Sequence, residues 1–255
     1  AMIDGLFRPW FGGVFLDRSL EASSSAFEYS FSMFSAGRTA LPADGMGAIP
    51  RQIADSLPEG TIRLGACVES IDGQRVWLAS GEELETPNLV LATEAPQTSR
   101  LLGEAPPAPG RGVRTLHFAA DEPPVREPIL VLNGEGSGPV NDMCVPSQVA
   151  SSYASNGRAL VSATVLDDVP ESGEALVGAV RSQMRGWFGE KAADWQHLRT
   201  HRIQHALPAQ SPGRLRGDGP CVRPGLYVCG DHREAASLQG AMLSGRRAAE
   251  AILDI

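Results

Sequence analysis

The sequence predicts a mixed fold of the α/β (α+β) class, and three observations carry that prediction. A short apolar run at residues 226–229 ends in Gly230-Asp231 and is followed by a helical pattern that reaches residue 252. Residues 61–93 are rich in short strands and turns, and the run 88–93 has the composition of a buried strand. Residues 171–189 repeat apolar side chains at helical spacing.

The composition is that of an ordinary globular protein of one or two domains. Of the 255 residues, 42% are hydrophobic and 20% are charged, and the formal net charge is −8. This acidic balance argues against nucleic-acid binding, which uses a basic face. No apolar run approaches the roughly 20 residues of a membrane helix, and the first residues lack a signal-peptide pattern. We therefore expect a cytoplasmic protein.

The four cysteines are widely spaced and form no CxxC pair. Structural zinc sites and disulfide frameworks both depend on closely patterned cysteines. We therefore expect neither zinc nor a disulfide, and we expect reduced thiols.

The first 60 residues predict two helices with a glycine turn between them. A helix is expected over residues 19–36, although residues 27–34 also alternate as a strand would. Gly45 and Gly47 permit close backbone approach, and a helix is expected to begin after Ala48 and to stop at Pro58. The aromatic stretch at residues 7–15 is either buried or lines a ligand, and burial is the commoner case.

The next segment reads as strands. We expect strands at residues 61–65 and 68–71, and a hairpin that joins 76–78 to 83–84 through Ser80-Gly81. The buried strand at 88–93 is followed by a loop at 93–96. Strands at 114–119 and 129–132 then lie between proline-rich loops, and a strand at 160–166 precedes the helix at 171–189.

Residues 133–139, NGEGSGP, follow a strand and resemble a dinucleotide-binding glycine motif. Their context differs, because the third glycine is one position early and Pro146 follows too soon for a packed helix. A turn between two antiparallel strands explains the segment better.

Three histidines recur at every fourth position, at His197, His201 and His205. On a helix this spacing would form a metal-binding stripe. However, no carboxylate or cysteine joins the pattern, and residues 200–204 have the composition of a strand. We therefore predict no metal site.

The segment after residue 229 is the strongest functional signal. A strand, a Gly-Asp pair and a helix rich in small residues bring unpaired N–H groups and a positive dipole end to one point. Such a point favours an electron-rich group, and Asp231 can accept hydrogen bonds from hydroxyls. A strand–turn–helix that merely ends an α/β domain has the same pattern.

The same residues, GLYVCGD and SLQGAMLSGRRAAEAI, resemble the C-terminal flavin-binding segment of the FAD-dependent amine oxidase, protoporphyrinogen oxidase and phytoene desaturase superfamily. The resemblance implies that the Gly230-Asp231 pair contacts the ribityl–pyrophosphate region of FAD. It implies that the α-helix start faces the pyrimidine edge of the flavin, through the backbone of Leu238, Gln239, Gly240 and Ala241.

Three further segments match the same superfamily. The turn that contains Gly45 and Gly47 would open a helix near the flavin and the substrate cavity. Val68 matches the position that meets the adenine through backbone groups. The strand end HALP would line the substrate cavity with His205 and Leu207.

The resemblance covers nearly the whole chain but only the part of the family that follows the first strand–GxGxxG–helix unit. It implies a two-domain FAD-binding oxidoreductase fold. Residues 1–60 and 100–210 would form a substrate-binding domain with a mixed sheet and helices, and residues 61–99 and 211–255 would form a partial FAD-binding domain. The missing unit would lie in cis or on a partner chain. The sequence would then be a shortened product or half of a split protein, and we expect it to bind FAD weakly or not at all.

The implied reaction is hydride transfer from an organic substrate to FAD. An amine or an apolar molecule, such as a polyene or isoprenoid, would be the substrate, and the aromatic stretch 7–15 favours the apolar class. Glu94 and His232 lie near the motifs, but the sequence compels no acid–base residue. The alternative is a non-catalytic binding module that kept the same scaffold.

Overall fold

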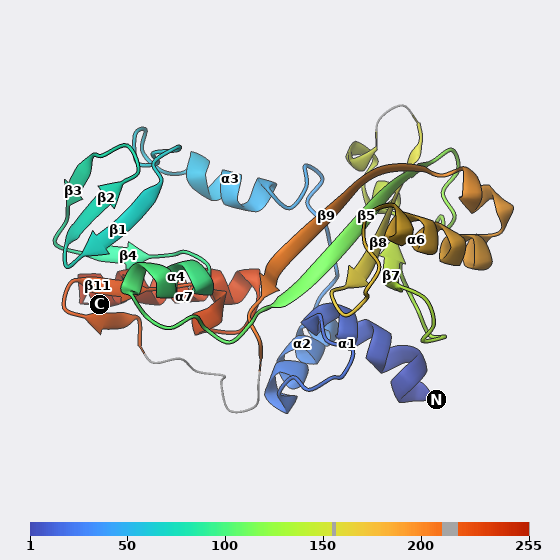
Figure 1. Cartoon of the computed structure of the whole chain (residues 1–255), viewed down its shortest axis with the longest axis horizontal. Coiled ribbons are helices and arrows are strands. Elements are labelled where there is room, and N and C mark those ends of the chain that lie inside the picture. Colours follow the sequence, from blue (N-terminus) through green and yellow to red (C-terminus); the bar gives the residue numbers. More distant parts are fainter. Residues whose placement is uncertain (155–156, 211–218, 255) are drawn as a thin grey trace. The chain divides into compact units, whose positions relative to one another are not determined.

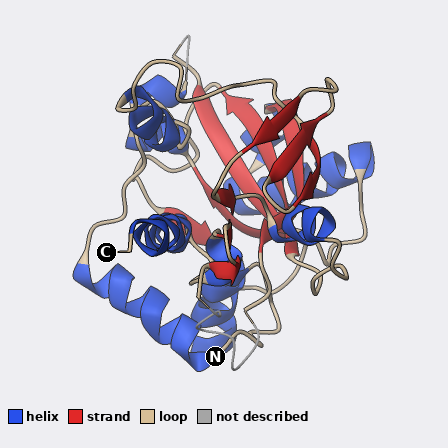
Figure 2. Ribbon diagram, turned by 90° about the vertical axis from the view of Figure 1, so that its left-hand side faces the viewer, coloured by secondary structure: helices blue, strands red, loops and turns tan. Residues whose placement is uncertain are grey.

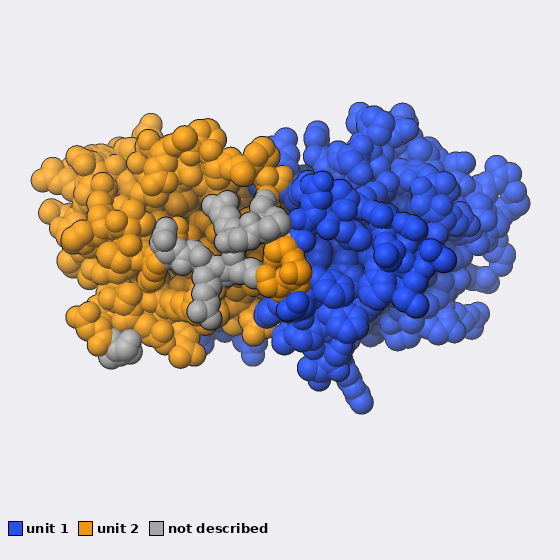
Figure 3. Space-filling model, turned by 90° about the horizontal axis from the view of Figure 1, so that it is seen from below, with its two compact units in different colours: residues 1–22, 27–56, 111–206 blue, residues 23–26, 57–110, 207–255 orange. Residues whose placement is uncertain are grey.

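The computed structural model describes residues 1–154, 157–210 and 219–254, and the chain divides into two compact units. Unit 1 comprises residues 1–22, 27–56 and 111–206, and unit 2 comprises residues 23–26, 57–110 and 207–255; Figure 3 colours the two.

Unit 1 is built on a five-stranded sheet in the order β6-β7-β8-β5-β9, with the strands drawn in red in Figure 2. The pairs β6·β7, β7·β8 and β5·β8 are antiparallel. The strands are β5 (Arg111–Ala120), β6 (Leu130–Leu132), β7 (Val140–Cys144), β8 (Ala159–Leu166) and β9 (Gln196–Leu207).

Helix α6 (Gly173–Phe188) covers one face of this sheet and completes the main core. Leu116 and Val161 from the strands are fully buried with Val180 and Met184 from the helix. Because alternate residues of a strand point to opposite faces, one set of alternate apolar residues on β5 and β8 shares this core with α6. The short elements α5 (Pro146–Val149) and η2 (Ser151–Tyr153) connect β7 to β8, and η3 (Glu190–Asp194) connects α6 to β9.

The aromatic residues of the N-terminal segment pack against one another. The elements are η1 (Ile3–Phe7), α1 (Arg8–Phe15) and α2 (Ser24–Ala36). The rings of Phe11 and Phe27 lie 4.7 Å apart, and Phe11 is only 2% exposed. This packing accounts for the aromatic density at residues 7–15 without a ligand.

Unit 2 contains two three-stranded sheets (Figure 1). One is the antiparallel meander β1 (Val68–Asp72), β2 (Arg75–Leu78) and β3 (Glu83–Glu85). The other has the order β10-β11-β4, in which β11 (Leu226–Val228) is antiparallel to β10 (Cys221–Arg223) and parallel to β4 (Leu89–Leu91). Helices α4 (Ala95–Leu102) and α7 (Leu238–Leu253) follow β4 and β11, and the short η4 (Asp231–Arg233) precedes α7.

The mixed α/β fold and most predicted elements are confirmed. The hairpin β2·β3, the strands β1, β4, β5, β6 and β8, and the helices α6 and α7 occur where the sequence predicts them. Helix α3 (Ala48–Asp55) follows a turn at Gly45, whose φ is +82°. Residues 133–139 connect the antiparallel strands β6 and β7, as predicted.

Three predictions are corrected. No strand forms at residues 61–65, because no strand pairs with that segment in the described structure. Gly65 has φ +74°, and Leu64 is 89% exposed. The predicted loop at 93–96 already contains the start of α4, because Pro96 in the first turn is compatible with a helix. The helix expected at 19–36 begins only at Ser24, after Leu20 adopts φ +59°.

The three histidines at every fourth position lie on strand β9 rather than on a helix. In the ranges that the structure describes, no group of three or more His, Cys, Asp or Glu side chains is placed to hold a metal ion. A search of those same ranges finds no helix with the length and apolar character needed to cross a bilayer.

Candidate functional site

The candidate site lies where the parallel strands β4 and β11 end in unit 2. Leu91 and Val228 pair in register, and the N–H of Cys229 continues the ladder with a 3.0 Å hydrogen bond to the carbonyl oxygen of Leu91. Each strand is followed, three residues later, by a carboxylate: Glu94 after β4 and Asp231 after β11. The carboxyl ends of parallel strands share one edge of a sheet, so both carboxylates belong to the same edge.

The turn after β11 requires a glycine. Gly230 has φ +149°, and a Cβ atom there would lie 2.6 Å from the His232 ring. The N–H of Gly230 donates a 3.1 Å hydrogen bond to the Oγ of Ser244, a side chain that is 4% exposed. This bond fixes the strand end to helix α7, so the position of Asp231 depends on the helix that follows it.

The start of α7 is capped by Ser237. Its Oγ accepts a 3.0 Å hydrogen bond from the N–H of Gly240, which satisfies one of the free donors of the first turn. Gly240 is also required for packing, because a Cβ there would lie 1.9 Å from the carbonyl oxygen of Ala235. Leu238 and Gln239 remain exposed, so the first turn presents backbone to its surroundings.

The two carboxylates differ in environment. The Asp231 side chain is 34% exposed, and its burial raises the carboxyl pKa. His232, whose Nδ1 lies 3.9 Å from the carboxylate, opposes that rise, and Glu94 adds to it by repulsion. Glu94 is exposed at the N-cap position of α4, where its side chain makes no capping hydrogen bond. The edge is therefore a cluster of acceptors.

The other predicted residues are placed as follows. Val68 begins β1 and packs on the small core of unit 2, and its carbonyl oxygen accepts a hydrogen bond of 3.4 Å from Arg100. Gly45 and Gly47 lie before α3 in unit 1, in a turn whose Pro42 carbonyl oxygen accepts from the hydroxyl of Tyr153 at 2.7 Å. His205 is exposed near the end of β9, and Leu207, the last residue of that strand, is partly buried.

Sequence reasoning missed the serines that hold the site. A serine before an apolar helical pattern is a common N-cap, and Ser237 could have been found by that rule. Ser244 has no comparable signal, since its role depends on the turn that it contacts.

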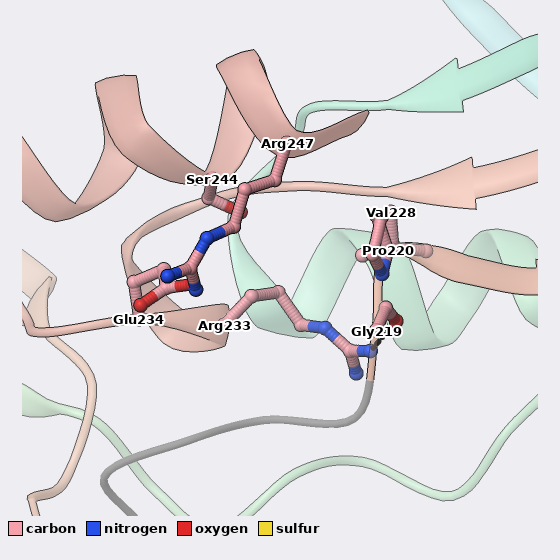
Figure 4. A pocket seen from close by; sticks show the side chains of 7 residues that line it. All are labelled: Gly219, Pro220, Val228, Arg233, Glu234, Ser244 and Arg247. Atoms are coloured by element: carbon pink, nitrogen blue, oxygen red, sulfur yellow. Dashed lines mark hydrogen bonds and ion pairs between the residues drawn. The ribbon is translucent and has the colours of Figure 1, made fainter. Parts of the chain in front are cut away.

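A pocket of about 290 Å³, open to solvent, lies beside the same helix (Figure 4). Its lining comprises Gly219, Pro220, Val228, Arg233, Glu234, Ser244 and Arg247. Arg247 forms an ion pair with Glu234, and Arg233 donates a 2.9 Å hydrogen bond to the carbonyl oxygen of Gly219. The ion pair joins the loop after η4 to α7, and the Arg233 hydrogen bond joins η4 to the residues before β10.

Three solved structures have a similar fold, and two of them are oxidases by name. A reduced UDP-galactopyranose mutase aligns with a TM-score of 0.73 at 14% identity, over 99% of this chain and 65% of its own. A candidate protoporphyrinogen oxidase from Exiguobacterium sp. 255-15 aligns with a TM-score of 0.65 at 20% identity, over 83% of this chain and 51% of its own. Cyclohexylamine oxidase from Brevibacterium oxydans IH-35A aligns with a TM-score of 0.58 at 16% identity, over 82% of this chain and 52% of its own. The chain thus spans about half to two thirds of these proteins.

No curated protein sequence matches the chain. At the level of families, the match is extensive: the family described as flavin containing amine oxidoreductase matches residues 1–253. This match includes the β11–Gly230-Asp231–α7 segment and both units. The chain therefore belongs to the flavin containing amine oxidoreductase family.

Proposed function

We propose that the chain is the flavin-contacting and substrate-binding portion of an FAD-dependent oxidoreductase. The observation that carries the proposal is the position of Asp231, at the end of a parallel strand and joined to α7 through the Gly230–Ser244 hydrogen bond. A bound flavin would supply the redox chemistry by accepting a hydride from an organic substrate. Amines and apolar molecules, including polyenes and isoprenoids, are the proposed substrate classes.

The residues at this edge suit one part of FAD and not another. Asp231 and Glu94 are acceptors, and they match the hydroxyl groups of a ribityl or ribose chain. A diphosphate would be repelled by two carboxylates, because like charges at short range disfavour each other. The capped first turn of α7, around Leu238 to Ala241, offers a positive dipole end to an electron-rich ring edge. We therefore propose that this chain alone binds FAD weakly or not at all.

The unpaired edge of strand β4 in the unit 2 sheet favours pairing with a strand from a further unit. Among the described residues β4 has a neighbouring strand on one side only, and its Val90 is 37% exposed. Parallel sheets are normally extended and covered on both faces. The chain also spans only about half to two thirds of its solved relatives. We propose that a strand–GxGxxG–helix unit, in cis or on a partner chain, completes the diphosphate site.

The remaining assignments belong to the same proposal. Unit 1 would bind substrate. His205 and Leu207, near the end of β9, would line the substrate cavity, and Leu207 is the first residue of the stretch of unit 2 that follows. Unit 2 would be the partial FAD-binding domain, with the backbone of Val68 near the adenine. Gly45 and Gly47 would approach the flavin. The four cysteines, which are free thiols in the structure, support a reducing, cytoplasmic setting.

A flavin titration tests the proposal. FAD binding to the chain is followed by flavin fluorescence and calorimetry for wild type, Asp231→Ala and the matched exposed control Asp72→Ala. Saturable binding that Asp231→Ala weakens and Asp72→Ala does not supports the assignment of Asp231 to the flavin site. Binding of equal strength in wild type and Asp231→Ala contradicts that assignment. If the chain does not bind, the adjoining coding sequence is added. A strand–GxGxxG–helix that restores binding supports a shortened or split oxidoreductase, and a reading frame without one favours a non-catalytic binding module on the same scaffold.

A further inference from the structure

One face of the five-stranded sheet of unit 1 carries two rows of hydrogen-bonding side chains. On β7, β8 and β5, the alternate residues Met143, Ala163 and Leu116 are fully buried in the core with α6. Their sequence neighbours therefore point to the opposite face. Register pairs place those neighbours in two rows across the strands, Cys144–Ser162–His117 and Asp142–Thr164–Thr115.

Strand β9 extends the first of these rows. The imidazole ring of His201 lies 5.4 Å from that of His117, centroid to centroid, in an edge-on arrangement. Seven polar residues on four adjacent strands thus share one surface, which we call the polar face. They are Thr115, His117, Asp142, Cys144, Ser162, Thr164 and His201.

This polar face differs from an ordinary solvated sheet face. The meander of unit 2 shows what a solvated face in this protein contains, because its exposed positions include Glu69, Arg75 and Glu83. The polar face instead carries small hydroxyls, a thiol and imidazoles. Its Asp142 is 8% exposed, and apart from His201 the other members are all partly buried. Partial burial of uncharged polar groups is costly unless they find hydrogen-bond partners.

Burial shifts the pKa of three groups on this face, Cys144, Asp142 and His117, in the direction of their neutral forms. Burial raises the pKa of the Cys144 thiol to about 11, and the nearby Asp142 contributes to the rise. Burial also raises the pKa of Asp142 itself. For His117, burial lowers the imidazole pKa, and His201 and His197 lower it further. The thiol and the His117 imidazole are therefore neutral at pH 7.

His117 also has unused hydrogen-bonding capacity. Its Nδ1 atom is buried and has no hydrogen-bond partner within the described part of the chain. A buried polar atom of this kind calls for a partner. Ser162 is its register neighbour on one side and His201 contacts it on the other, so a partner placed over His117 also reaches their side chains.

We propose that the polar face binds a small neutral molecule that carries hydroxyl or carbonyl groups, through Ser162, His117 and His201. A neutral imidazole, as at His117, and a hydroxyl, as at Ser162, can each donate to and accept from such groups. An ammonium or carboxylate ion would be desolvated beside His117 without an opposite charge in the same row, which is unfavourable. The carboxyl group of Asp142 lies in the other row, is 8% exposed and already accepts a hydrogen bond from Asn141. The inference rests on the proposed function only in naming this molecule as the substrate, and there it selects oxygen-bearing substrates over pure hydrocarbons.

The test compares three probes with the same ring and different charge, added to the full chain without flavin. They are cyclohexanol, cyclohexylammonium and cyclohexanecarboxylate at pH 7.5, and the readout is the NMR signals of the histidine ring protons. Cyclohexanol is expected to shift the signals of His117 and His201 saturably, while the signal of His232 in unit 2 serves as the internal reference. The two ions are expected to bind at least about fivefold more weakly.

Substitutions assign the binding to this surface. Ser162→Ala removes one hydrogen bond and is expected to weaken cyclohexanol binding about two- to tenfold. The matched control Ser70→Ala, on exposed strand β1, is expected to leave it unchanged. Equal binding of all three probes, tighter binding of an ion, no shift at His117, or indifference to Ser162→Ala would each overturn the inference. Because no flavin is present, a failed FAD titration leaves this result unaffected.

Discussion

The backbone N–H of Gly230 and the side chain of Ser244 are joined by a 3.1 Å hydrogen bond that connects the end of β11 to the second turn of α7. Ser244 is shielded from water, since it is 4% exposed, and Gly230 is partly buried. In the flavin containing amine oxidoreductase family, to which the chain belongs, this is the segment that we propose contacts the cofactor. The bond therefore holds the carboxylate of Asp231 in place before any ligand binds.

Removal of that bond should destabilise unit 2. Ser244→Ala leaves the Gly230 N–H without its acceptor, and an unsatisfied buried donor costs about 1–3 kcal/mol. We expect the free energy of unfolding, from urea titration, to fall by that amount. Ser70→Ala on exposed strand β1 is the control and should change it by less than about 0.5 kcal/mol. Equal effects of the two substitutions would show that the bond has no energetic role.

Two glycines of α7 should respond oppositely to alanine. A Cβ at Gly240 would lie 1.9 Å from the carbonyl oxygen of Ala235, whereas a Cβ at Gly245 meets nothing within 4 Å. Gly240→Ala should destabilise the protein by about 2 kcal/mol or more, because backbone must move. Gly245→Ala should stabilise it by about 0.5–1 kcal/mol through helix propensity. Thermal unfolding of both variants measures these changes in stability. A Gly240→Ala variant as stable as wild type would contradict the close approach of Gly240 to Ala235.

Asp142 should make stability depend on pH. Burial raises its pKa in the folded chain above the ordinary value of 3.8, so the folded state binds the proton more tightly than the unfolded state. Stability contributed by this group is therefore present at low pH and falls as the pH rises from about 4 through the folded pKa.

Asp142→Asn isolates this effect because the amide cannot ionise and its oxygen can still accept from Asn141. Relative to wild type, the variant should gain stability between pH 4 and pH 8 in urea titrations. Asp72→Asn, at an exposed position, should show no such gain. A variant that loses stability relative to wild type as the pH rises would indicate that the Asp142 carboxylate is stabilised by its surroundings.

The cysteines should differ strongly in reactivity. Cys67 and Cys221 are exposed, whereas the pKa of Cys144 is raised to about 11 by burial and by Asp142. Only the thiolate reacts, so at pH 8 iodoacetamide should modify Cys144 about a hundredfold more slowly than the exposed pair. Peptide mapping by mass spectrometry follows each site. Comparable rates at Cys144 and Cys221 would show that the polar face is open to solvent.

Local patterns predicted much of the unit 2 edge. The apolar run before Gly230 and the spacing of Leu238, Ala241 and Ala248 indicate a strand and a helix without any tertiary information. The strand predicted from composition at residues 61–65 does not form. Strand composition is realised only where a partner strand lies alongside, and Leu64 remains 89% exposed.

The polar face was beyond prediction for a different reason. His117, Cys144 and Ser162 come together through strand register, and the contact with His201 joins residues 84 positions apart in the sequence. A shift of one residue on any strand would send its polar side chains into the core. Likewise, histidines four residues apart lie on one face of a helix and also on one face of a strand. Only the fold shows that the His201 ring contacts His117 while the His197 ring contacts Phe118.

We propose that the carboxylates of Asp231 and Glu94 suit a polyol and not a diphosphate. Calorimetric titrations of this chain with riboflavin, adenosine and FAD test this proposal, because FAD joins the riboflavin and adenosine groups through a diphosphate. We expect FAD to bind no more tightly than riboflavin, with dissociation constants within about twofold or both too weak to saturate. FAD binding at least about tenfold tighter than riboflavin, an advantage of about 1.4 kcal/mol, without detectable binding of adenosine, would contradict the proposal and would locate a diphosphate site within these 255 residues.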